Sequence, residues 1–333
     1  MEKSPIDIIA KKIHESQRIA ITSHLRPDGD SICTSLALFY MGKLLGKDTA
    51  IINKDKTPYP FNNFSDVDNI TIGQIPLNSF DIVILLECAN VSRSGQKNIN
   101  NYYKVNIDHH YSNDYYADIN WVDPQASAVA SMIYTLGERL KIKFTPQIAD
   151  HLYCALVSDT GSFQFSNTRA KSFEVASKLV EHGANLNKLS ELLFNSNSPE
   201  KIKLLGQVLS TLRINTHGTI ATITMFKENL DSLNLKEIDT EDITTLARSI
   251  KGIQMVLFFK EIKKDTFRVS LRSKGASNAV LVAEYFGGGG HFHAAGFTIT
   301  GKYHKLQQEI PEIVNKLLTE SQKNPDALKT HIN

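Results

Sequence analysis

The chain has 333 residues, with 37 Lys and Arg against 35 Asp and Glu, so its formal net charge is only +2. This balance leaves no basic stripe for long nucleic acid, and short anionic substrates fit it better. No apolar stretch approaches the length of a membrane span, and the polar N-terminus lacks the apolar core of a signal peptide. A chain of this length exceeds one typical core, so we expect two domains.

The first apolar strand pattern, residues 19–22, runs into a polar turn and then into a helix pattern. Gly29 allows that turn to bend sharply, so Asp28 and Asp30 can be presented from one loop beside His24. The ordinary alternative is a turn in which Asp30 or the following serine caps the helix.

Two further apolar runs end in polar groups. Residues 80–86 form a continuous apolar run typical of a buried parallel strand, and Glu87 stands at its end. A later run ends in Asp108, His109 and His110. Strand ends of this kind point into the ligand crevice of α/β proteins. The alternatives are a solvated acid and two surface histidines.

A helix pattern that begins near His151 ends in Asp159 at a polar, glycine-containing turn. Asp159 is a candidate ligand, and the alternative is a plain helix-terminal carboxylate. Residues 169–210 look helical, with a break at residues 195–199. Pro199 suits the first turn of the helix that follows.

From Leu212 onward the pattern changes to strands at residues 220–226, 253–263 and 266–271, with helices between them, which predicts a second and smaller α/β domain. Arg272 and Lys274 alternate at the end of the last of these strands, so they should share a face. They could clamp a phosphate or carboxylate, or be a solvated basic face.

Four successive glycines, which include Gly288, Gly289 and Gly290, precede His291. Glycines leave backbone N–H groups unshielded, so such a loop can approach a phosphate closely. A flexible linker is the alternative, but it would be an unusual neighbour for His291 between a helix and a strand pattern.

The N-terminal motifs together offer two histidines and four acids. Imidazole with carboxylate suits manganese, zinc or iron, and carboxylates with water suit magnesium or manganese. This set is larger than a single tetrahedral site needs, so we infer a two-metal centre with a shared carboxylate. Two metals about 3.5–4 Å apart would lower the pKa of a water and hold the attacking and leaving oxygens.

The ordered motifs Ser-His-Leu-Arg-Pro-Asp-Gly-Asp-Ser, Leu-Glu-Cys-Ala, Asp-His-His and Ser-Asp-Thr-Gly-Ser-Phe resemble the DHH phosphoesterase superfamily. The segments Ser-Leu-Arg-Ser-Lys-Gly and Phe-Gly-Gly-Gly-Gly-His resemble the DHH-associated domain. The resemblance runs from about residue 19 to about residue 299. It is closest to the bifunctional oligoribonucleases, or nano-RNases, that also remove the 3'-phosphate of 3'-phosphoadenosine-5'-phosphate (pAp).

The resemblance implies a role for each matching residue. One metal would be held by His24 and Asp28, and the other by Asp30, His109 and Asp159. Glu87 would bridge them, where the family typically has Asp. Asp108 would orient its neighbours and His110 would face the substrate, as the catalytic pair. The implied substrate-binding residues are Arg272, Ser273, Lys274, Gly288, Gly289, Gly290 and His291.

The expected fold is α/β: a catalytic domain over residues 1–190 with a mainly parallel sheet flanked by helices, a helical linker over 191–211, and a smaller domain over 212–325. We expect the active site in the cleft between the domains, two divalent ions, manganese or alternatively magnesium, and a homodimer by resemblance. Cys33, Cys88 and Cys154 lie in apolar patterns without metal spacing, which predicts buried thiols in the reducing cytoplasm.

The leading functional prediction is hydrolysis of short oligoribonucleotides and of pAp, with small nucleotides as substrates and neither long nucleic acid nor membrane as a partner. A phosphodiesterase for cyclic or linear dinucleotides is the sibling alternative. An alternative of another class is a catalytically weakened nucleotide-binding protein, suggested by Glu87 in the bridging position. The four-glycine segment with His291 argues against a pyrophosphatase.

Overall fold

The computed structural model describes residues 4–235 and 240–323, which fall into two compact units divided between Ser196 and Asn197. The boundary falls inside the expected linker, residues 191–211. The first three residues of the expected catalytic domain, and residues 236–239 and the last two residues of the expected second domain, lie outside the described residues.

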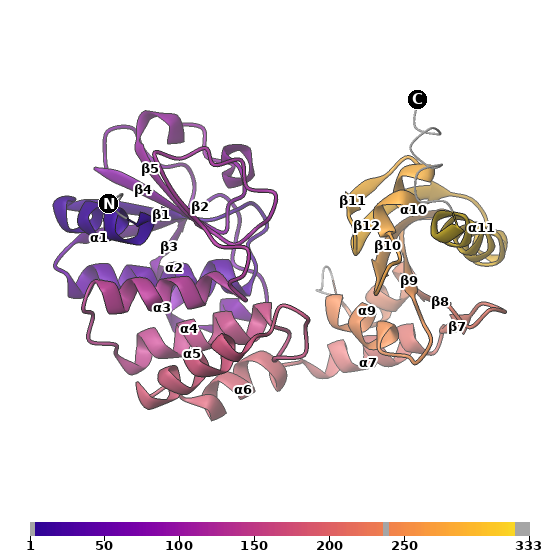
Figure 1. The fold of residues 1–333 in the computed structure, drawn as a ribbon. Helices are drawn as coiled ribbons and strands as arrows, with labels where there is room; N and C mark the ends of the chain where they lie inside the picture. Colours follow the sequence, from indigo (N-terminus) through magenta and orange to yellow (C-terminus); the bar gives the residue numbers. More distant parts are fainter. Residues whose placement is uncertain (1–3, 236–239, 324–333) are drawn as a thin grey trace. The chain divides into compact units, whose positions relative to one another are not determined.

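The first unit is built on a six-stranded parallel sheet (Figure 1). Its strands are β1 (Arg18–Thr22), β2 (Asp48–Asn53), β3 (Ile70–Ile72), β4 (Ile82–Leu86), β5 (Tyr103–Asp108) and β6 (Ile119–Val122). Its helices are α1 (Pro5–Glu15), α2 (Gly29–Leu44), α3 (Val129–Arg139), α4 (Pro146–Asp159), α5 (Ala170–Glu181) and α6 (Leu186–Phe194), with short 3-10 helices η1 (Phe61–Asn63), η2 (Ser65–Asn69), η3 (Val91–Ser94) and η4 (Ile99–Asn101).

The strand order is β3-β2-β1-β4-β5-β6, so the chain builds outward from β1 on one side and then returns to add β4 on the other. Helices α2 and α3 pack on one face, with α4 behind them, around a large apolar core. Residues of η3 and η4 contribute to a smaller core on the opposite face, with Ala20, Val83 and Leu85 from the strands. Both faces are therefore covered, as a parallel sheet requires.

The second unit contains a mixed sheet in which only β8 and β9 are parallel, among the described strands. Its strands are β7 (Arg213–Ile214), β8 (Ile220–Met225), β9 (Met255–Lys263), β10 (Thr266–Ser273), β11 (Gly289–His291) and β12 (Ala294–Thr300), in the order β11-β12-β10-β9-β8-β7. Its helices are α7 (Pro199–Leu209), α8 (Lys227–Ser232), α9 (Glu241–Arg248), α10 (Ala279–Tyr285) and α11 (Tyr303–Lys323).

The second unit has apolar clusters on both faces of its sheet. One cluster joins strand residues such as Leu257 and Val269 to α10 and α11, and the other joins Val256 and Phe258 to α7 and α9. The expected two-domain α/β fold is therefore confirmed. Pro199 begins α7, and Asn278 caps α10 by accepting hydrogen bonds from two backbone N–H groups.

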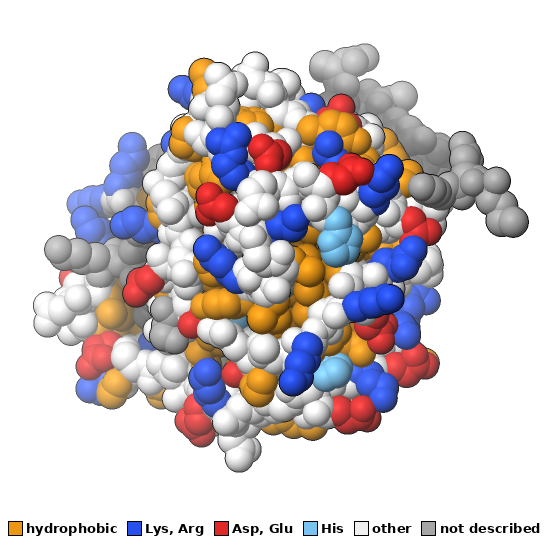
Figure 2. All heavy atoms as spheres, turned by 90° about the vertical axis from the view of Figure 1, so that its left-hand side faces the viewer, with side chains coloured by type: hydrophobic (Ala, Val, Ile, Leu, Met, Phe, Trp, Pro, Cys, Tyr) orange, Lys and Arg blue, Asp and Glu red, His pale blue; other side chains and the backbone are white. Residues whose placement is uncertain are grey.

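The distribution of surface charge and the burial of the cysteines agree with what the sequence predicts. On the face shown in Figure 2, basic and acidic side chains are interspersed. Cys33, Cys88 and Cys154 are buried and free, as predicted. Within the described ranges, no helix combines the length and the apolar character that crossing a membrane needs.

Candidate metal centre

The candidate ligands of the first unit lie at the carboxyl ends of neighbouring strands. His24 follows β1, Glu87 follows β4, and His109 and His110 follow β5. Strands β1 and β4 pair side by side, and the chain reverses its direction of growth between them. A crevice at such a switch point is the usual ligand site of an open α/β sheet.

His24, Asp28 and Glu87 form one cluster, whose ligand atoms lie within 4.8 Å of one another. The Nε2 atom of His24 lies 3.6 Å from Asp28 Oδ2 and 3.9 Å from Glu87 Oε2. Its Nδ1 atom lies 2.8 Å from the carbonyl oxygen of Leu25, which fixes the ring. Such a contact leaves Nε2 as the metal-binding nitrogen.

Asp28 is also the residue that caps α2. Its Oδ1 accepts a hydrogen bond from the Ser31 N–H at 3.0 Å, and the Ser31 hydroxyl lies 3.0 Å from the Asp28 N–H. The alternative in which Asp30 or Ser31 caps this helix is therefore wrong. The capping box holds Asp28 at the start of α2, where its other carboxylate oxygen faces His24.

Asp30, His109 and Asp159 form a second cluster, whose ligand atoms also lie within 4.8 Å of one another. The Nε2 atom of His109 lies 3.1 Å from Glu87 Oε1 and 3.8 Å from Asp159 Oδ2, while its Nδ1 lies 3.0 Å from the carbonyl of Ala126. Glu87 also belongs to a third group, with His109 and His110. It is therefore the carboxylate that joins the clusters.

Asp30 is held by a helix far away in the sequence. Its two carboxylate oxygens accept hydrogen bonds from the N–H groups of Val129, at 2.6 Å, and Ala130, at 3.1 Å, at the start of α3. The carboxylate is buried there and faces the positive end of the helix dipole. Each carboxylate oxygen has a further lone pair for a metal.

Asp108 is buried and contacts the ring of His110. Its Oδ1 lies 2.6 Å from His110 Nδ1, and its Oδ2 accepts a hydrogen bond from Asn113 at 2.5 Å. Asn113 donates to Asn106 as well, at 2.8 Å. Asn113 was not singled out from the sequence, where an asparagine in a polar loop carries no signal. Asp108, held by Asn113, orients the ring of His110, which is partly exposed.

Asn167 is a second residue that the sequence did not indicate. Its side-chain N–H groups donate to the Asp159 carbonyl at 3.0 Å and to Asp159 Oδ2 at 3.3 Å, and also to the carbonyl of Ser127 at 2.9 Å. It therefore ties the end of α4 to the loop that holds His109.

The backbone of Glu87 is strained. Its φ angle is +55°, in the left-handed region that side chains other than glycine rarely adopt. Its N–H donates to the Ile107 carbonyl at 3.1 Å, which fixes this conformation at the end of β4. Strain of this kind persists where the surrounding structure holds a functional group in position.

The carboxylates of the two clusters repel one another. Burial raises the pKa values of Asp30 and Glu87, and the charges of neighbouring carboxylates raise them further. Burial also raises the pKa of Asp159 to about 6, against the opposing charge of His109. Burial would raise the pKa of Asp28 and lower that of His24, but their mutual attraction reverses both shifts.

This donor set fits divalent metal ions. Within residues 4–235 and 240–323, Glu87 Oε2 is a buried atom that has no hydrogen-bond partner. A buried carboxylate oxygen without a partner is costly unless it binds a metal. The Nε2 atoms of His24 and His109 face the same carboxylate, and nitrogen with carboxylate oxygen is the donor combination of manganese, zinc and iron sites.

The predicted substrate residues all belong to the second unit. Arg272 pairs with Ala294 of β12, and Ala294 pairs with His291 of β11, so these three backbone positions form one row across the sheet. Gly290 pairs with Ala295. Gly289 to His291 thus form an edge strand rather than a loop, while Gly288 precedes it. The side chain of His291 lies outside the description.

Lys274 does not lie on the strand face predicted for it, and the side chains of Lys274 and Ser273 both contact other groups of the protein. Strand β10 ends at Ser273, so Lys274 lies beyond it and does not share a strand face with Arg272. The Lys274 ammonium donates to the carbonyl of Arg248, the last residue of α9, at 2.9 Å, and to the carbonyl of Ile250 at 3.2 Å. Ser273 is buried, with its hydroxyl 3.0 Å from His293 Nδ1. The helix end attracts the lysine because its carbonyls are unpaired there.

Comparison with known proteins places these observations in a family. A model described as "DHH family, N-terminal domain" matches residues 18–156, and one described as "DHHA1 domain" matches residues 218–322. The bifunctional oligoribonuclease and PAP phosphatase NrnA of Thermus thermophilus is 30% identical over 90% of each chain. The chain belongs to the DHH family. It is thus a member of a family of hydrolytic phosphoesterases, as predicted.

A second curated relative agrees with this assignment, and a solved structure shares the fold. The enzyme of Bacillus subtilis that carries the same name is 29% identical to this DHH-family chain over 84% of it and 89% of the relative. The crystal structure of an exopolyphosphatase-related protein from Bacteroides fragilis superposes with a TM-score of 0.84 at 23% identity, over 98% of this chain and 97% of that one. At that identity the structural likeness supports the fold.

Proposed function

We propose that the protein is a metal-dependent phosphohydrolase that degrades short oligoribonucleotides and removes the 3'-phosphate of pAp. The observation that carries the proposal is the position of Glu87 between two ligand clusters, one with His24 and Asp28 and one near His109 and Asp159. The names of the relatives, bifunctional oligoribonuclease and PAP phosphatase, support the substrate class.

Two divalent ions, for which we propose manganese, would activate a water and neutralise charge on the phosphate. Asp108 keeps the Nδ1–H of His110 engaged, so that His110 Nε2 can hold or donate a proton at the leaving oxygen. Asn113 and two backbone N–H groups support the charge of Asp108 in turn. We propose that Arg272 and the backbone of Gly288 to Gly290 contact the substrate from the second unit.

The test is turnover of pAp, RNA dimers, longer RNA, cyclic dinucleotides and pyrophosphate with added manganese. We expect pAp and the shortest RNAs to be the preferred substrates, and a chelator to abolish turnover. Preference for cyclic or linear dinucleotides alone would replace the proposal with the phosphodiesterase alternative. Nucleotide binding without any turnover would instead favour the weakened-site alternative.

A matched pair of histidine variants tests the metal centre. His109→Gln removes the nitrogen that faces Glu87 and Asp159, so turnover should fall at least about a hundredfold. His14→Gln changes an exposed histidine of α1 and should leave turnover unchanged. Equal activity of the two variants would remove His109 from the mechanism.

A further inference from the structure

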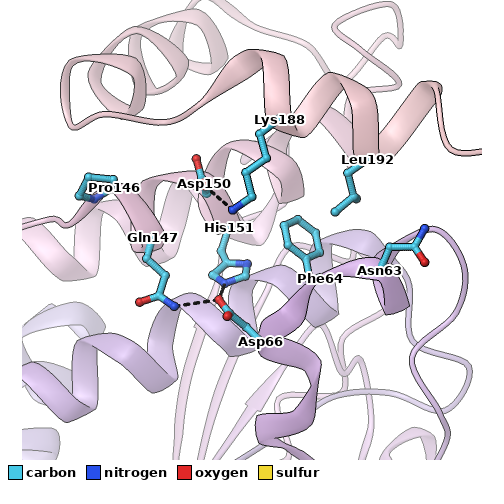
Figure 3. Close-up of a pocket in the computed structure, with 9 residues that line it drawn as sticks. All are labelled: Asn63, Phe64, Asp66, Pro146, Gln147, Asp150, His151, Lys188 and Leu192. Carbon is cyan, nitrogen blue, oxygen red and sulfur yellow. Dashed lines mark hydrogen bonds and ion pairs between the residues drawn. The ribbon is translucent and has the colours of Figure 1, made fainter.

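Two large cavities of the first unit have linings that exclude the candidate metal ligands, and they differ in how their charged side chains are paired. The larger, of about 440 Å³, is shown in Figure 3. Its charged side chains pair with one another: His151 Nε2 lies 2.8 Å from Asp66 Oδ2, and Lys188 Nζ lies 3.3 Å from Asp150 Oδ2. These internal pairs account for the charge in that cavity.

The second cavity, of about 380 Å³, lies between the end of β6, the loop after it, α3 and the start of α5. Small-molecule sites commonly have about 300–1,000 Å³, so this space suits a ligand of mononucleotide size. The residues that matter for its chemistry are Trp121, Asp123, Gln125, Met132, Arg169 and Lys171.

Of the two cations that line this cavity, Arg169 is the one that remains available. Across the described ranges, 4–235 and 240–323, no hydrogen bond or ion pair engages its guanidinium. Its backbone N–H donates to the Ser172 hydroxyl, and its backbone carbonyl accepts from the Ser172 N–H. Lys171 instead pairs with Glu174 at 3.2 Å, and Asp123 accepts the Gln125 N–H at 2.9 Å. A planar guanidinium is suited to bidentate contact with a phosphate.

Trp121 supplies an aromatic surface in the same cavity. It is partly exposed, on the edge strand β6, opposite Ile107 of β5. An indole and an unpaired guanidinium that line one cavity can bind a nucleobase by stacking and its phosphate by charge. Met132 adds an apolar contact from α3.

The loop that lines the cavity also supports the metal centre. The carbonyl of Ala126, a lining residue, lies 3.0 Å from His109 Nδ1. The carbonyl of Ser127, also lining, accepts a hydrogen bond from Asn167. Gln125 donates to the hydroxyl of Tyr111, next to His110. The loop of residues 125–127 therefore lines the cavity and also contacts the residues around the metal centre.

We propose that this cavity binds a nucleoside monophosphate unit, with its base against Trp121 and its phosphate at Arg169. The choice of a nucleotide as ligand rests on the proposed function. Two sources share this chemistry: the nucleotide next to the scissile one in a short RNA, and a free mononucleotide released by hydrolysis.

The chain contains a single tryptophan, so intrinsic tryptophan fluorescence reports on this cavity directly. The experiment titrates full-length protein with AMP in the presence of a chelator. We expect a saturable fluorescence change. Arg169→Ala should weaken binding about tenfold or more, because a charge-assisted contact is lost. Lys178→Ala changes an exposed cation of α5, the helix that Arg169 precedes, and this variant should bind AMP like the wild type.

An unchanged fluorescence at millimolar AMP, or equal affinity of Arg169→Ala and the wild type, would overturn the proposal. A far-ultraviolet circular dichroism spectrum of Arg169→Ala is the control for the fold, which should be unchanged because Arg169 is exposed. Because the titration needs no metal and no turnover, it stands apart from the proposed function. A wild type that binds AMP at Trp121 but hydrolyses no nucleotide would refute that function alone.

Turnover with manganese then identifies the source. A selective fall of kcat/KM for RNA dinucleotides in Arg169→Ala, with pAp turnover unchanged, assigns the cavity to the second nucleotide of RNA. Unchanged turnover of both substrates, together with the weakened AMP binding, assigns it to the free mononucleotide.

Discussion

Glu87 combines a strained left-handed backbone with a buried carboxylate oxygen that has no hydrogen-bond partner in the described structure, and the buried oxygen is costly without a metal. We expect Glu87→Gln to lower manganese-dependent turnover at least about a hundredfold, because the shared negative charge is lost. The same change should raise the melting temperature of the chelated protein, because burial and the repulsion from Asp28 and Asp159 both disfavour a charge at this position. Relief of 1 kcal/mol corresponds to roughly 2–4 °C in a domain of this size.

Thermal melts with chelator and initial rates with manganese measure the two effects together. The control is Glu15→Gln, an exposed change on α1 that should alter neither quantity. A variant that lost activity but melted at the wild-type temperature would show that the cluster is not strained by its charges.

Asp81 offers a prediction about acid stability. Its Oδ2 accepts hydrogen bonds from the N–H groups of Gln17, at 2.8 Å, and Arg18, at 2.9 Å, which join the start of β4 to β1. The Arg18 and Gln17 N–H groups lower the pKa of Asp81. Asp81→Ala should cost about 1 kcal/mol at neutral pH, a modest value because the carboxylate is partly exposed.

The sign of the pH dependence follows from the lowered pKa. The stabilisation by Asp81 is complete above the unfolded pKa, about 3.9, and is lost as the pH falls through the lower folded pKa. Urea unfolding of wild type and Asp81→Ala should therefore converge at about pH 2–3. Asp48→Ala, which changes an exposed aspartate at the start of β2, controls for general loss of charge. A gap that widened in acid would contradict the hydrogen-bond explanation.

At the scale of elements, strand ends were predictable because apolar runs of parallel strands stop where the polar site begins. That rule located Glu87 and His109 correctly at one edge of the sheet. Contacts between distant segments were not predictable: Asp30 caps α3 across 99 residues, and no local pattern marks that pairing. Likewise, Gly289 and Gly290 join an edge strand because β12 offers a partner, which the glycines alone do not indicate.

The packing of α2 against α4 makes Gly29 a sensitive position. A Cβ atom there would overlap the Ser158 hydroxyl and the ring of Phe61. Gly29→Ala should therefore push the start of α2 away, which displaces Asp28 and Asp30. Overpacking of this kind costs about 1–3 kcal/mol, and turnover should fall as well.

Gly206→Ala is the matched control, because in the described structure a Cβ at that helical position of α7 would meet no atom within 4 Å apart from its chain neighbours and the backbone of its own helix. It should leave turnover intact and stabilise the chain by up to about 1 kcal/mol. Urea unfolding measures the stability of the two variants, and initial rates measure their turnover. If Gly29→Ala were as harmless as Gly206→Ala, close packing at α2 would not position the carboxylates.

At the scale of the whole molecule, composition was sufficient to predict two domains and buried thiols, because both follow from chain length and residue type. It could not predict that α7 packs on the second unit, since its apolar positions Leu204 and Val208 would suit either core. The homodimer and the domain limits of residues 1–190 and 212–325 stay predictions.

The two units have separate apolar cores, and all six candidate metal ligands lie in the first. We therefore expect manganese to stabilise the first unit selectively, since a ligand stabilises only the folded state that binds it. The single tryptophan, Trp121, also lies in the first unit, so its fluorescence follows that unit alone, whereas far-ultraviolet circular dichroism follows both. With manganese, the fluorescence transition should move to higher temperature while part of the dichroism transition stays in place. With a chelator, the two probes should approach each other again. Coincident transitions under both conditions would mean that the chain unfolds as one cooperative body despite its separate cores.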